Sequence, residues 1–461
     1  MGDTYVNFFG GSPLNRLAWL RTSQPFLNAI AHAPATRWVL FKDGQPLVQS
    51  KPSAPTLSLA RLTTNDVKAL LGPEPYFAQG QHAGDLAPAD VPALEAARLR
   101  GNGVVFLGLH ETNRSHADAL PSSDFSAKTS ADVVLSNIKG TAYFSLDVST
   151  VAQSELDETL QNAAAAKEGD RIVFSEPRTA TASFDAFDAA VFAEARSMTD
   201  WNARNKFCPG CGSPVHSLWA GWKLSCSSLL PWAANPAGQK PCITAQGLHN
   251  FAHPRTDAVV IMAVIDETGD KILLGRNKKW PGKFYSCLAG FIEPGETFED
   301  AVRRELWEEA GVKVWNVRYH STQPWPYPAN LMGGFYATAS SSEPLRVDLD
   351  NELEEARWWT RDEILSVLHH RDGTTLSQRD RRELFTATEN LKPTEQPPAT
   401  SGANPLAGDA VKEGEKAAVD AARELSTGPL FKMPPVTAVA GVLINEWAHG
   451  RAGFQPESPK L

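Results

Sequence analysis

One segment constrains this chain more than any other: residues 289–312, A-G-F-I-E-P-G-E-T-F-E-D-A-V-R-R-E-L-W-E-E-A-G-V. The Pro-Gly pair at 294–295 predicts a turn, Thr297 belongs to the residue types that cap helices, and Gly311 suits a helix C-terminus. Residues 298–310 are helix formers throughout. The segment therefore predicts a turn followed by a capped helix.

The predicted helix gathers acidic side chains on one face. Glu305, Glu308 and Glu309 stand at i, i+3 and i+4, while Val302 and Leu306 turn toward a core. Three neighbouring carboxylates repel one another, and hard divalent cations that take oxygen ligands relieve the repulsion. The alternative is a solvated acidic helix with Glu–Arg pairs.

The same segment fits the pattern G-x5-E-x7-R-E-U-x-E-E-x-G-U, where U is a bulky aliphatic residue, and this resembles a complete Nudix box. The matching positions are Gly290, Glu296, Arg304, Glu305, Leu306, Glu308, Glu309, Gly311 and Val312. The resemblance implies an α/β fold, the Nudix α/β/α sandwich with a mixed sheet.

The resemblance also implies roles for the box residues. Glu305, Glu309 and the carbonyl of Ala289 would bind catalytic Mg2+ or Mn2+, with Glu308 as a ligand or a close neighbour of one. Glu309 is the first candidate for the general base. The remaining box residues, Gly290, Glu296, Arg304 and Gly311, are expected to be structural, with Arg304 pairing with Glu296 or another box carboxylate.

Length and composition set the outer bounds. The 461 residues suggest about two to four domains. The net charge of −9 gives no sign of a broad basic surface, so an RNA substrate is expected to be recognised mainly at its end. No secretory signal or membrane-spanning apolar run is evident, and a soluble intracellular protein without membrane insertion is expected.

Residues 1–200 read as a mixed α/β domain. Strand-like runs lie at 38–41, 104–109 and 143–148, and a helix-like run lies at 184–201. The opening F-F-G-G-S-P-L-N-R-L, from Phe8 to Leu17, resembles the start of the N-terminal domain of NADH pyrophosphatases. Scaffolding and homodimer formation are the roles expected of this domain.

Residues 201–252 read as a zinc-ribbon segment. Cys208 and Cys211 form a C-x-x-C knuckle, and Cys226 and Cys242 follow at wider spacing. Four thiolates would complete a structural zinc site. The alternatives are unpaired thiols, or His216 or His249 in place of the fourth cysteine. The fifth cysteine, Cys287, is expected to be a core residue.

Residues 253–445 form the expected Nudix domain, with a strand pair at 259–265 and 271–275 and a segment at 285–289 that leads into the box. Downstream of the box, S-T-Q-P-W-P-Y-P-A-N (321–330) resembles the S-Q-P-W-P-F-P-x-S element of NADH pyrophosphatases. The resemblance implies substrate contacts from Gln323, Pro324, Trp325, Pro326, Tyr327, Pro328 and Asn330. The alternative is a Pro/aromatic loop packed on the domain edge.

Four further positions carry expected contacts by the same resemblance. Glu352 aligns with a glutamate of the metal and substrate site, or belongs to a surface acidic run. Phe291 aligns with an aromatic that stacks on the nucleotide, or seals the core. The segment 433–440, M-P-P-V-T-A-V-A, resembles the family's closing helix, whose final residue Ala440 contacts substrate. His253 stands where the family often has Tyr or Phe.

Two stretches near the C-terminus have other expectations. Residues 391–427 are rich in Pro, Ala, Gly, Glu and Lys and predict a disordered insertion. The tail, 446–461, ends in Pro459-Lys460-Leu461, a variant of the S-K-L address that a peroxisomal import receptor reads. A peroxisomal or otherwise cytoplasmic location is expected.

These resemblances imply an NADH pyrophosphatase of the fungal, peroxisomal type. It would hydrolyse NADH, and NAD+ more slowly, to NMNH (or NMN) and AMP, and would act on NAD-capped RNA ends. The alternatives are a Nudix hydrolase that prefers ADP-ribose or diadenosine polyphosphates, and a non-catalytic nucleotide-binding protein.

Overall fold

The computed structural model describes residues 6–79, 96–111, 130–137, 140–230, 242, 244, 253–280, 282–292, 296–349, 352–377, 380 and 428–453. The predicted insertion at 391–427, the Pro-Gly pair at 294–295, His249 and the C-terminal tripeptide lie outside these residues. The chain divides into two compact units. The N-terminal unit comprises 8–257 and 324–331, and the C-terminal unit comprises 1–7, 258–323 and 332–461.

The N-terminal unit is built on a mixed eight-stranded sheet with the order β1-β6-β7-β2-β3-β4, in which β5 pairs with β2 and β8 with β3. Among the described strand pairs of this sheet, β2–β7 is parallel and the others are antiparallel. The strands are β1 (Leu14–Asn15), β2 (Arg37–Lys42), β3 (Gln45–Lys51), β4 (Ala54–Leu59), β5 (Leu62–Thr63), β6 (Val104–His110), β7 (Thr141–Asp147) and β8 (Arg171–Phe174). The helices are η1 (Ala18–Leu20), α1 (Gln24–His32), α2 (Thr64–Val67), η2 (Lys68–Leu71), α3 (Ala131–Asn137), α4 (Gln153–Asn162), α5 (Ala164–Lys167), α6 (Pro177–Thr181) and α7 (Ala186–Arg204).

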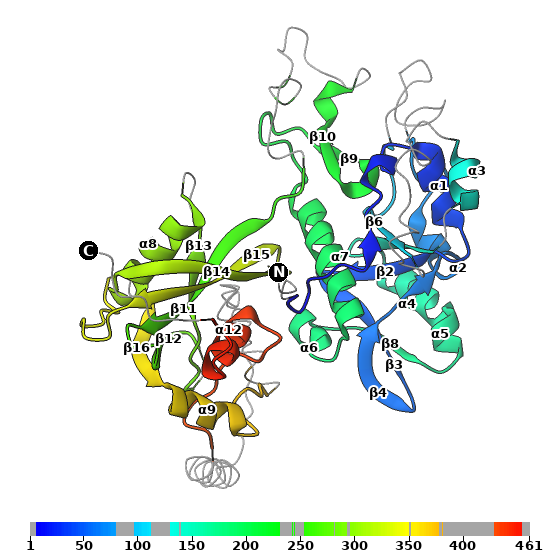
Figure 1. Cartoon of the computed structure of the whole chain (residues 1–461). Coiled ribbons are helices and arrows are strands. Elements are labelled where there is room, and N and C mark those ends of the chain that lie inside the picture. The colour runs from blue at the N-terminus through cyan, green and yellow to red at the C-terminus, as the bar shows by residue number, and fades with distance from the viewer. Residues whose placement is uncertain are drawn as a thin grey trace, which may run out of the picture. The chain divides into compact units, whose positions relative to one another are not determined.

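Alternation along the strands buries both faces of this sheet. Trp38 and Leu40 of β2 pack in a core with Phe26 of α1. Val39 and Phe41, which point the other way, pack in a second core with Phe192 of α7. The predicted strands at 38–41, 104–109 and 143–148 correspond to β2, β6 and β7, and the predicted helix at 184–201 corresponds to α7 (Figure 1).

A hairpin follows α7 in the N-terminal unit. Strands β9 (Val215–Leu218) and β10 (Lys223–Cys226) pair antiparallel, with η4 (Trp219–Gly221) between them and η5 (Ser227–Leu229) after them. Of the predicted zinc cysteines, Cys226 ends β10, Cys208 and Cys211 precede β9, and Cys242 follows η5.

The C-terminal unit contains a six-stranded sheet with the order β14-β15-β11-β12-β16, in which β13 pairs with β11. Its strands are β11 (Asp257–Asp266), β12 (Lys271–Asn277), β13 (Leu288–Phe291), β14 (Val314–Trp325), β15 (Asn330–Ala339) and β16 (Leu353–Thr360). Its described helices are α8 (Phe298–Ala310), α9 (Arg361–His369) and α12 (Val439–Ala448).

Strand β11 shows how this sheet is sandwiched. Val260 and Met262 pack with Leu306 of α8. Ile261, Ala263 and Ile265 point the other way and pack with α9 and α12, for example with Leu443. Helix α8 therefore covers one face of the sheet, and α9 and α12 cover the other (Figure 1). The predicted fold class, an α/β/α sandwich preceded by a cysteine-bearing hairpin and a mixed α/β domain, is confirmed.

Two boundaries differ from expectation. The segment expected to lead into the box, 285–289, enters a strand at Leu288, and this strand, β13, runs on to Phe291 within the box. The closing helix begins at Val439, so most of the 433–440 segment precedes it. Prolines at 434 and 435 lack the backbone N–H that a continuing helix needs. Among the described residues no helix is both long and apolar enough to cross a membrane.

Candidate active site and metal centres

Helix α8, which carries the box carboxylates, is capped at both ends. The hydroxyl of Thr297 accepts a hydrogen bond from the backbone N–H of Asp300, whose carboxylate reaches back to Thr297, and Gly311 ends the helix at φ 68°. Both predicted caps are confirmed. One face of α8, which includes Val302 and Leu306, lies in the core. Glu309 is also largely enclosed, with 4% of its surface exposed.

Arg304 links Glu296, which precedes α8, to the carboxylates of the helix. Its guanidinium donates to Glu296 through Nε at 2.6 Å and Nη2 at 2.8 Å. Nη1 donates to Glu305 at 2.8 Å and to Glu308 at 3.0 Å. Nη2 also reaches the carbonyl oxygen of Phe291 at 2.8 Å. The predicted pairing of Arg304 with Glu296 is confirmed, and the guanidinium links Phe291 of β13 and Glu296 to α8.

Glycine at position 290 makes room for Glu305. A Cβ on Gly290 would lie 1.9 Å from Cδ of Glu305 and 2.1 Å from its Oε1. The neighbouring Ala289 lies in register with Ile261 on β11. The carboxylate of Glu305 is therefore held against the β13 backbone, on the strand that also carries Ala289.

The electrostatics of this cluster favour a cation. Burial raises the pKa of Glu305, the negative charges of Glu308 and Glu352 raise it further, and Arg304 opposes the rise. The hydrogen bonds with Glu296, Glu305 and Glu308 raise the pKa of Arg304. Carboxylate oxygens that disfavour one another's charge, on a rigid helix beside a strand backbone, form a donor set suited to a hard divalent cation.

Glu352 is held near this cluster by a residue that the sequence did not single out. Asn277, at the end of β12, donates from Nδ2 to Oε1 of Glu352 at 2.8 Å. The backbone N–H of Lys278 donates to the carbonyl of Glu352 at 3.3 Å. The 75-residue separation between Asn277 and Glu352 leaves no local pattern that could have revealed the pair.

Phe291 projects from the end of β13 beside the box. Its side chain is 57% exposed, so it does not seal the core. The exposed position agrees with the expectation that the Phe291 ring is available to stack on a nucleotide base. A nucleotide contact from Phe291 remains a prediction.

Gln323 and Ala440 meet at the start of α12 in the C-terminal unit. The Gln323 side chain is fully buried, donates to the carbonyl of Thr437 and accepts from the N–H of Val439, both at 2.8 Å. Ala440 is buried, and its carbonyl lies 3.9 Å from Sγ of Cys287. These contacts give Gln323 a structural role in capping α12. Substrate contacts from Gln323 and Ala440 remain predictions.

The aromatic part of the predicted recognition loop packs within the N-terminal unit. Tyr327 is 8% exposed, and its hydroxyl lies 2.9 Å from Oγ1 of Thr181. The guanidinium of Arg178 lies 4.4 Å from the Tyr327 ring centre, and Trp325 makes edge contacts with Tyr327 and Phe9. Tyr327 is thus a core residue here, and its base-stacking role stays a prediction. The loop also contains Pro324, Pro326, Pro328 and Asn330.

His253 has an aromatic neighbour in the same N-terminal unit. Its ring centre lies 5.5 Å from that of Trp219, at the end of the zinc hairpin. The expected contact of His253 with substrate is not tested by this placement.

The four predicted zinc cysteines come together in the structure. The Sγ atoms of Cys208, Cys211, Cys226 and Cys242 all lie within 4.8 Å of one another. Two pairs, Cys208–Cys242 at 3.7 Å and Cys211–Cys226 at 3.4 Å, approach the sulfur separation of about 3.8 Å that tetrahedral coordination at about 2.3 Å requires. The donor set therefore fits a structural zinc ion.

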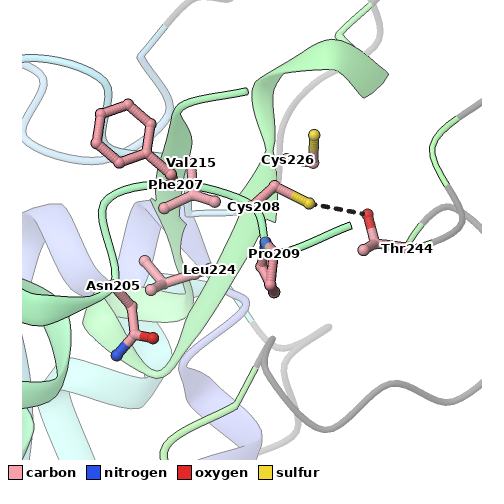
Figure 2. Close-up of a pocket in the computed structure, with 8 residues that line it drawn as sticks. All are labelled: Asn205, Phe207, Cys208, Pro209, Val215, Leu224, Cys226 and Thr244. Carbon is pink, nitrogen blue, oxygen red and sulfur yellow. Dashed lines mark hydrogen bonds between the residues drawn. The ribbon is translucent and has the colours of Figure 1, made fainter. Parts of the chain in front are cut away.

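Thr244 and the hairpin enclose the cysteine site. Sγ of Cys208 points toward Oγ1 of Thr244 at 3.8 Å, in a pocket that Val215 and Leu224 also line (Figure 2). Hydrogen bonds with Ser213 lower the pKa of the Cys211 thiol, whereas burial raises the pKa of the neighbouring Cys226 thiol.

The cluster among the described residues contains Cys242 and not His216. Burial lowers the pKa of His216 to about 4, so that ring is neutral at physiological pH. Cys287 lies apart from the cluster in the core of the C-terminal unit, as expected.

Comparisons with known proteins agree with this geometry. Residues 254–379 match the NUDIX domain family, and residues 35–201 match the NADH pyrophosphatase-like rudimentary NUDIX domain. Together with the box geometry on α8, these matches define the chain as a Nudix hydrolase.

Relatives that match most of this chain identify its family within the Nudix hydrolases. The chain is 36% identical over 368 residues to the NAD-capped RNA hydrolase NUDT12 of Homo sapiens, covering 78% of this chain and 68% of the relative. It is 32% identical to the NAD-capped RNA hydrolase of Schizosaccharomyces pombe (78% and 85% covered) and 33% identical to NPY1 of Saccharomyces cerevisiae (79% and 88%). The chain belongs to the NADH pyrophosphatase and NAD-capped RNA hydrolase family of Nudix hydrolases.

Proposed function

We propose that this enzyme hydrolyses the pyrophosphate bond of NADH, and of NAD+, to NMNH or NMN and AMP, and that it removes NAD caps from RNA 5′ ends. Three relatives that span most of the chain are named as NAD-capped RNA hydrolases. The observation that carries the proposal is the box geometry, in which Arg304 holds Glu305 and Glu308 beside the β13 backbone.

The donor set assigns the cation site to the C-terminal unit. Glu305, Glu308, Glu309, Glu352 and the carbonyl of Ala289 would hold Mg2+ or Mn2+. When bound, the cations neutralise charge on the diphosphate and lower the pKa of a bound water.

The chain's own groups supply positioning and proton transfer. Arg304 keeps the carboxylates of Glu305 and Glu308 in fixed directions, which limits their reorganisation during the reaction. Glu309, which is largely enclosed, accepts the proton from the attacking water. Phe291, exposed at the end of β13, stacks on a base of the dinucleotide.

The N-terminal unit is assigned a supporting role. A structural Zn2+ held by Cys208, Cys211, Cys226 and Cys242 stabilises the hairpin that follows α7. The unit contributes to a homodimer, and the C-terminal Pro459-Lys460-Leu461 directs the protein to peroxisomes through the import receptor.

Product analysis tests the proposal. Purified protein is incubated with Mg2+ and NADH, NAD+, ADP-ribose or diadenosine polyphosphates, beside the Glu309→Gln variant. The expected result is NMNH and AMP formed fastest from NADH and nearly lost in the variant. Faster cleavage of ADP-ribose or a polyphosphate would overturn the substrate assignment while leaving the Nudix chemistry intact.

A further inference from the structure

The turn that follows β12 concentrates basic side chains on an acidic protein. Lys278, Lys279 and Lys283 are all exposed and fall within six residues, whereas the whole chain carries a net charge of −9. Arg276, at the base of the turn, pairs with Glu354 at 2.9 Å. Three exposed lysines therefore lie within seven residues of Arg276.

Backbone and asparagine contacts fix the turn. The backbone N–H of Lys279 donates to Oδ1 of Asn277 at 2.9 Å, and that of Trp280 donates to the carbonyl of Asn277 at 3.0 Å. These bonds hold the backbone of residues 277–280 through contacts with Asn277.

The turn lies beside the candidate active site within the C-terminal unit. Asn277 donates to the carboxylate of Glu352, and the N–H of Lys278 donates to the Glu352 carbonyl. The charge of Glu352 in turn acts on Glu305 of α8. A dinucleotide whose pyrophosphate lies at these carboxylates would bring its next anionic group close to the lysines.

The possible substrates differ in whether the adenosine ribose carries a further anionic group. NADH carries no charge on its adenosine ribose. NAD-capped RNA carries a phosphodiester on the 3′ oxygen of that ribose, and NADPH carries a phosphate on the 2′ oxygen. Both are phosphate esters, and lysine ammonium groups bind phosphate oxygens as mobile point charges.

We propose that Lys278, Lys279 and Lys283 bind a phosphate ester on the adenosine ribose of the substrate, and so favour substrates that carry one over NADH. The proposal rests on the proposed function and adds a specificity determinant to it. The RNA phosphodiester and the NADPH phosphate are two sources of the same ligand chemistry.

The test compares three substrates in one triple variant, Lys278→Ala/Lys279→Ala/Lys283→Ala. The kcat/KM is measured on NADH, NADPH and a short NAD-capped oligoribonucleotide over a range of salt concentrations. A matched control replaces three exposed lysines of the N-terminal unit, Lys51, Lys68 and Lys167, with Ala. A second variant replaces the same turn lysines with Arg, which keeps the charge.

We expect kcat/KM on a substrate with the ribose phosphate to fall about tenfold in the triple Ala variant, while NADH changes less than about twofold. On capped RNA the salt slope should also become shallower by about 2, since each lost contact to single-stranded nucleic acid removes about 0.7. The Arg variant should retain most of the wild-type rate, and the control variant should match wild type.

The pattern of losses separates the outcomes. A fall confined to capped RNA assigns the turn to the 3′ phosphodiester, and a fall confined to NADPH assigns it to the 2′ phosphate. Equal changes on all three substrates, or no change on either phosphate-bearing one, would overturn the proposal while NADH cleavage by wild type still supports the proposed function. If wild type cleaves none of them, the proposed function fails, and this inference with it.

Discussion

The carboxylate of Glu305 occupies the space that a Cβ on Gly290 would need, 1.9 Å from its Cδ. The first glycine of the box thus allows a strand and a helix to bring a backbone carbonyl and a carboxylate together. The neighbouring carbonyl of Ala289 belongs to the same strand. This contact explains in physical terms why position 290 requires glycine.

Gly290→Ala should displace Glu305 from the β13 backbone. We expect kcat/KM on NADH to fall about 10- to 100-fold, the range seen when the support of a metal ligand is disturbed. Gly103→Ala is the control, because a Cβ there would lie at an ordinary contact distance of 3.6 Å from Cβ of Asp147. Unchanged activity in Gly290→Ala would show that the position of Glu305 is unimportant.

Arg304→Lys should loosen the box while leaving a positive charge. Lysine cannot reproduce the two-pronged contact with Glu296 or reach Glu305 and Glu308 at the same time. We expect a loss of about 10- to 100-fold in kcat.

The neighbouring residue offers a matched control for this substitution. Arg303 is exposed and pairs only loosely with Asp300, at 3.5 Å. Arg303→Lys should therefore retain wild-type kcat under the same conditions. Equal losses in the two variants would argue against a special role for the Arg304 fork.

The purified protein should contain about one zinc per chain, bound by the cysteine cluster. Cys242→Ser should lose this zinc and lower the thermal midpoint, because metal binding and folding of the hairpin are coupled. Elemental analysis and a thermal melt check both effects. Cys287→Ala should keep the zinc, since Cys287 lies outside the cluster. Zinc retained in full by Cys242→Ser would assign the fourth ligand elsewhere.

Tyr327→Phe separates a core role from a substrate contact. The substitution removes the hydrogen bond with Thr181, and we expect the free energy of unfolding to fall by about 1 kcal/mol. Because the ring is buried in the N-terminal unit, KM for NADH should not change. A raised KM at unchanged stability would instead place the Tyr327 hydroxyl on the substrate.

Local patterns in the sequence predicted the elements that local physics controls. The bounds of α8 follow from Thr297 and Gly311, and the Arg304–Glu296 pair spans only eight residues. The cysteines were predicted from residue type and spacing, although only the structure brings Cys242 to Cys208. Runs rich in β-branched or aromatic residues predicted β2, β6 and β7 of the N-terminal unit.

Such local patterns could not predict contacts between residues that are far apart in the sequence. Gln323 caps α12 across 116 residues, and Tyr327 meets Thr181 across 146. A polar or aromatic side chain in a Pro-rich loop suits a ligand and a buried partner equally well. The sequence therefore predicted substrate contacts for Gln323 and Tyr327, where the structure shows bonds within the protein.

The central claim is water-dependent cleavage of the pyrophosphate bond at the box carboxylates. The most direct test is mass spectrometry of the products formed from NADH and Mg2+ in 18O-labelled water, with wild type and Glu309→Gln. The account predicts NMNH and AMP, with one 18O per turnover in a product phosphate, and a much slower reaction in the variant. Release of dihydronicotinamide with ADP-ribose, or NMNH and AMP without label, would contradict it.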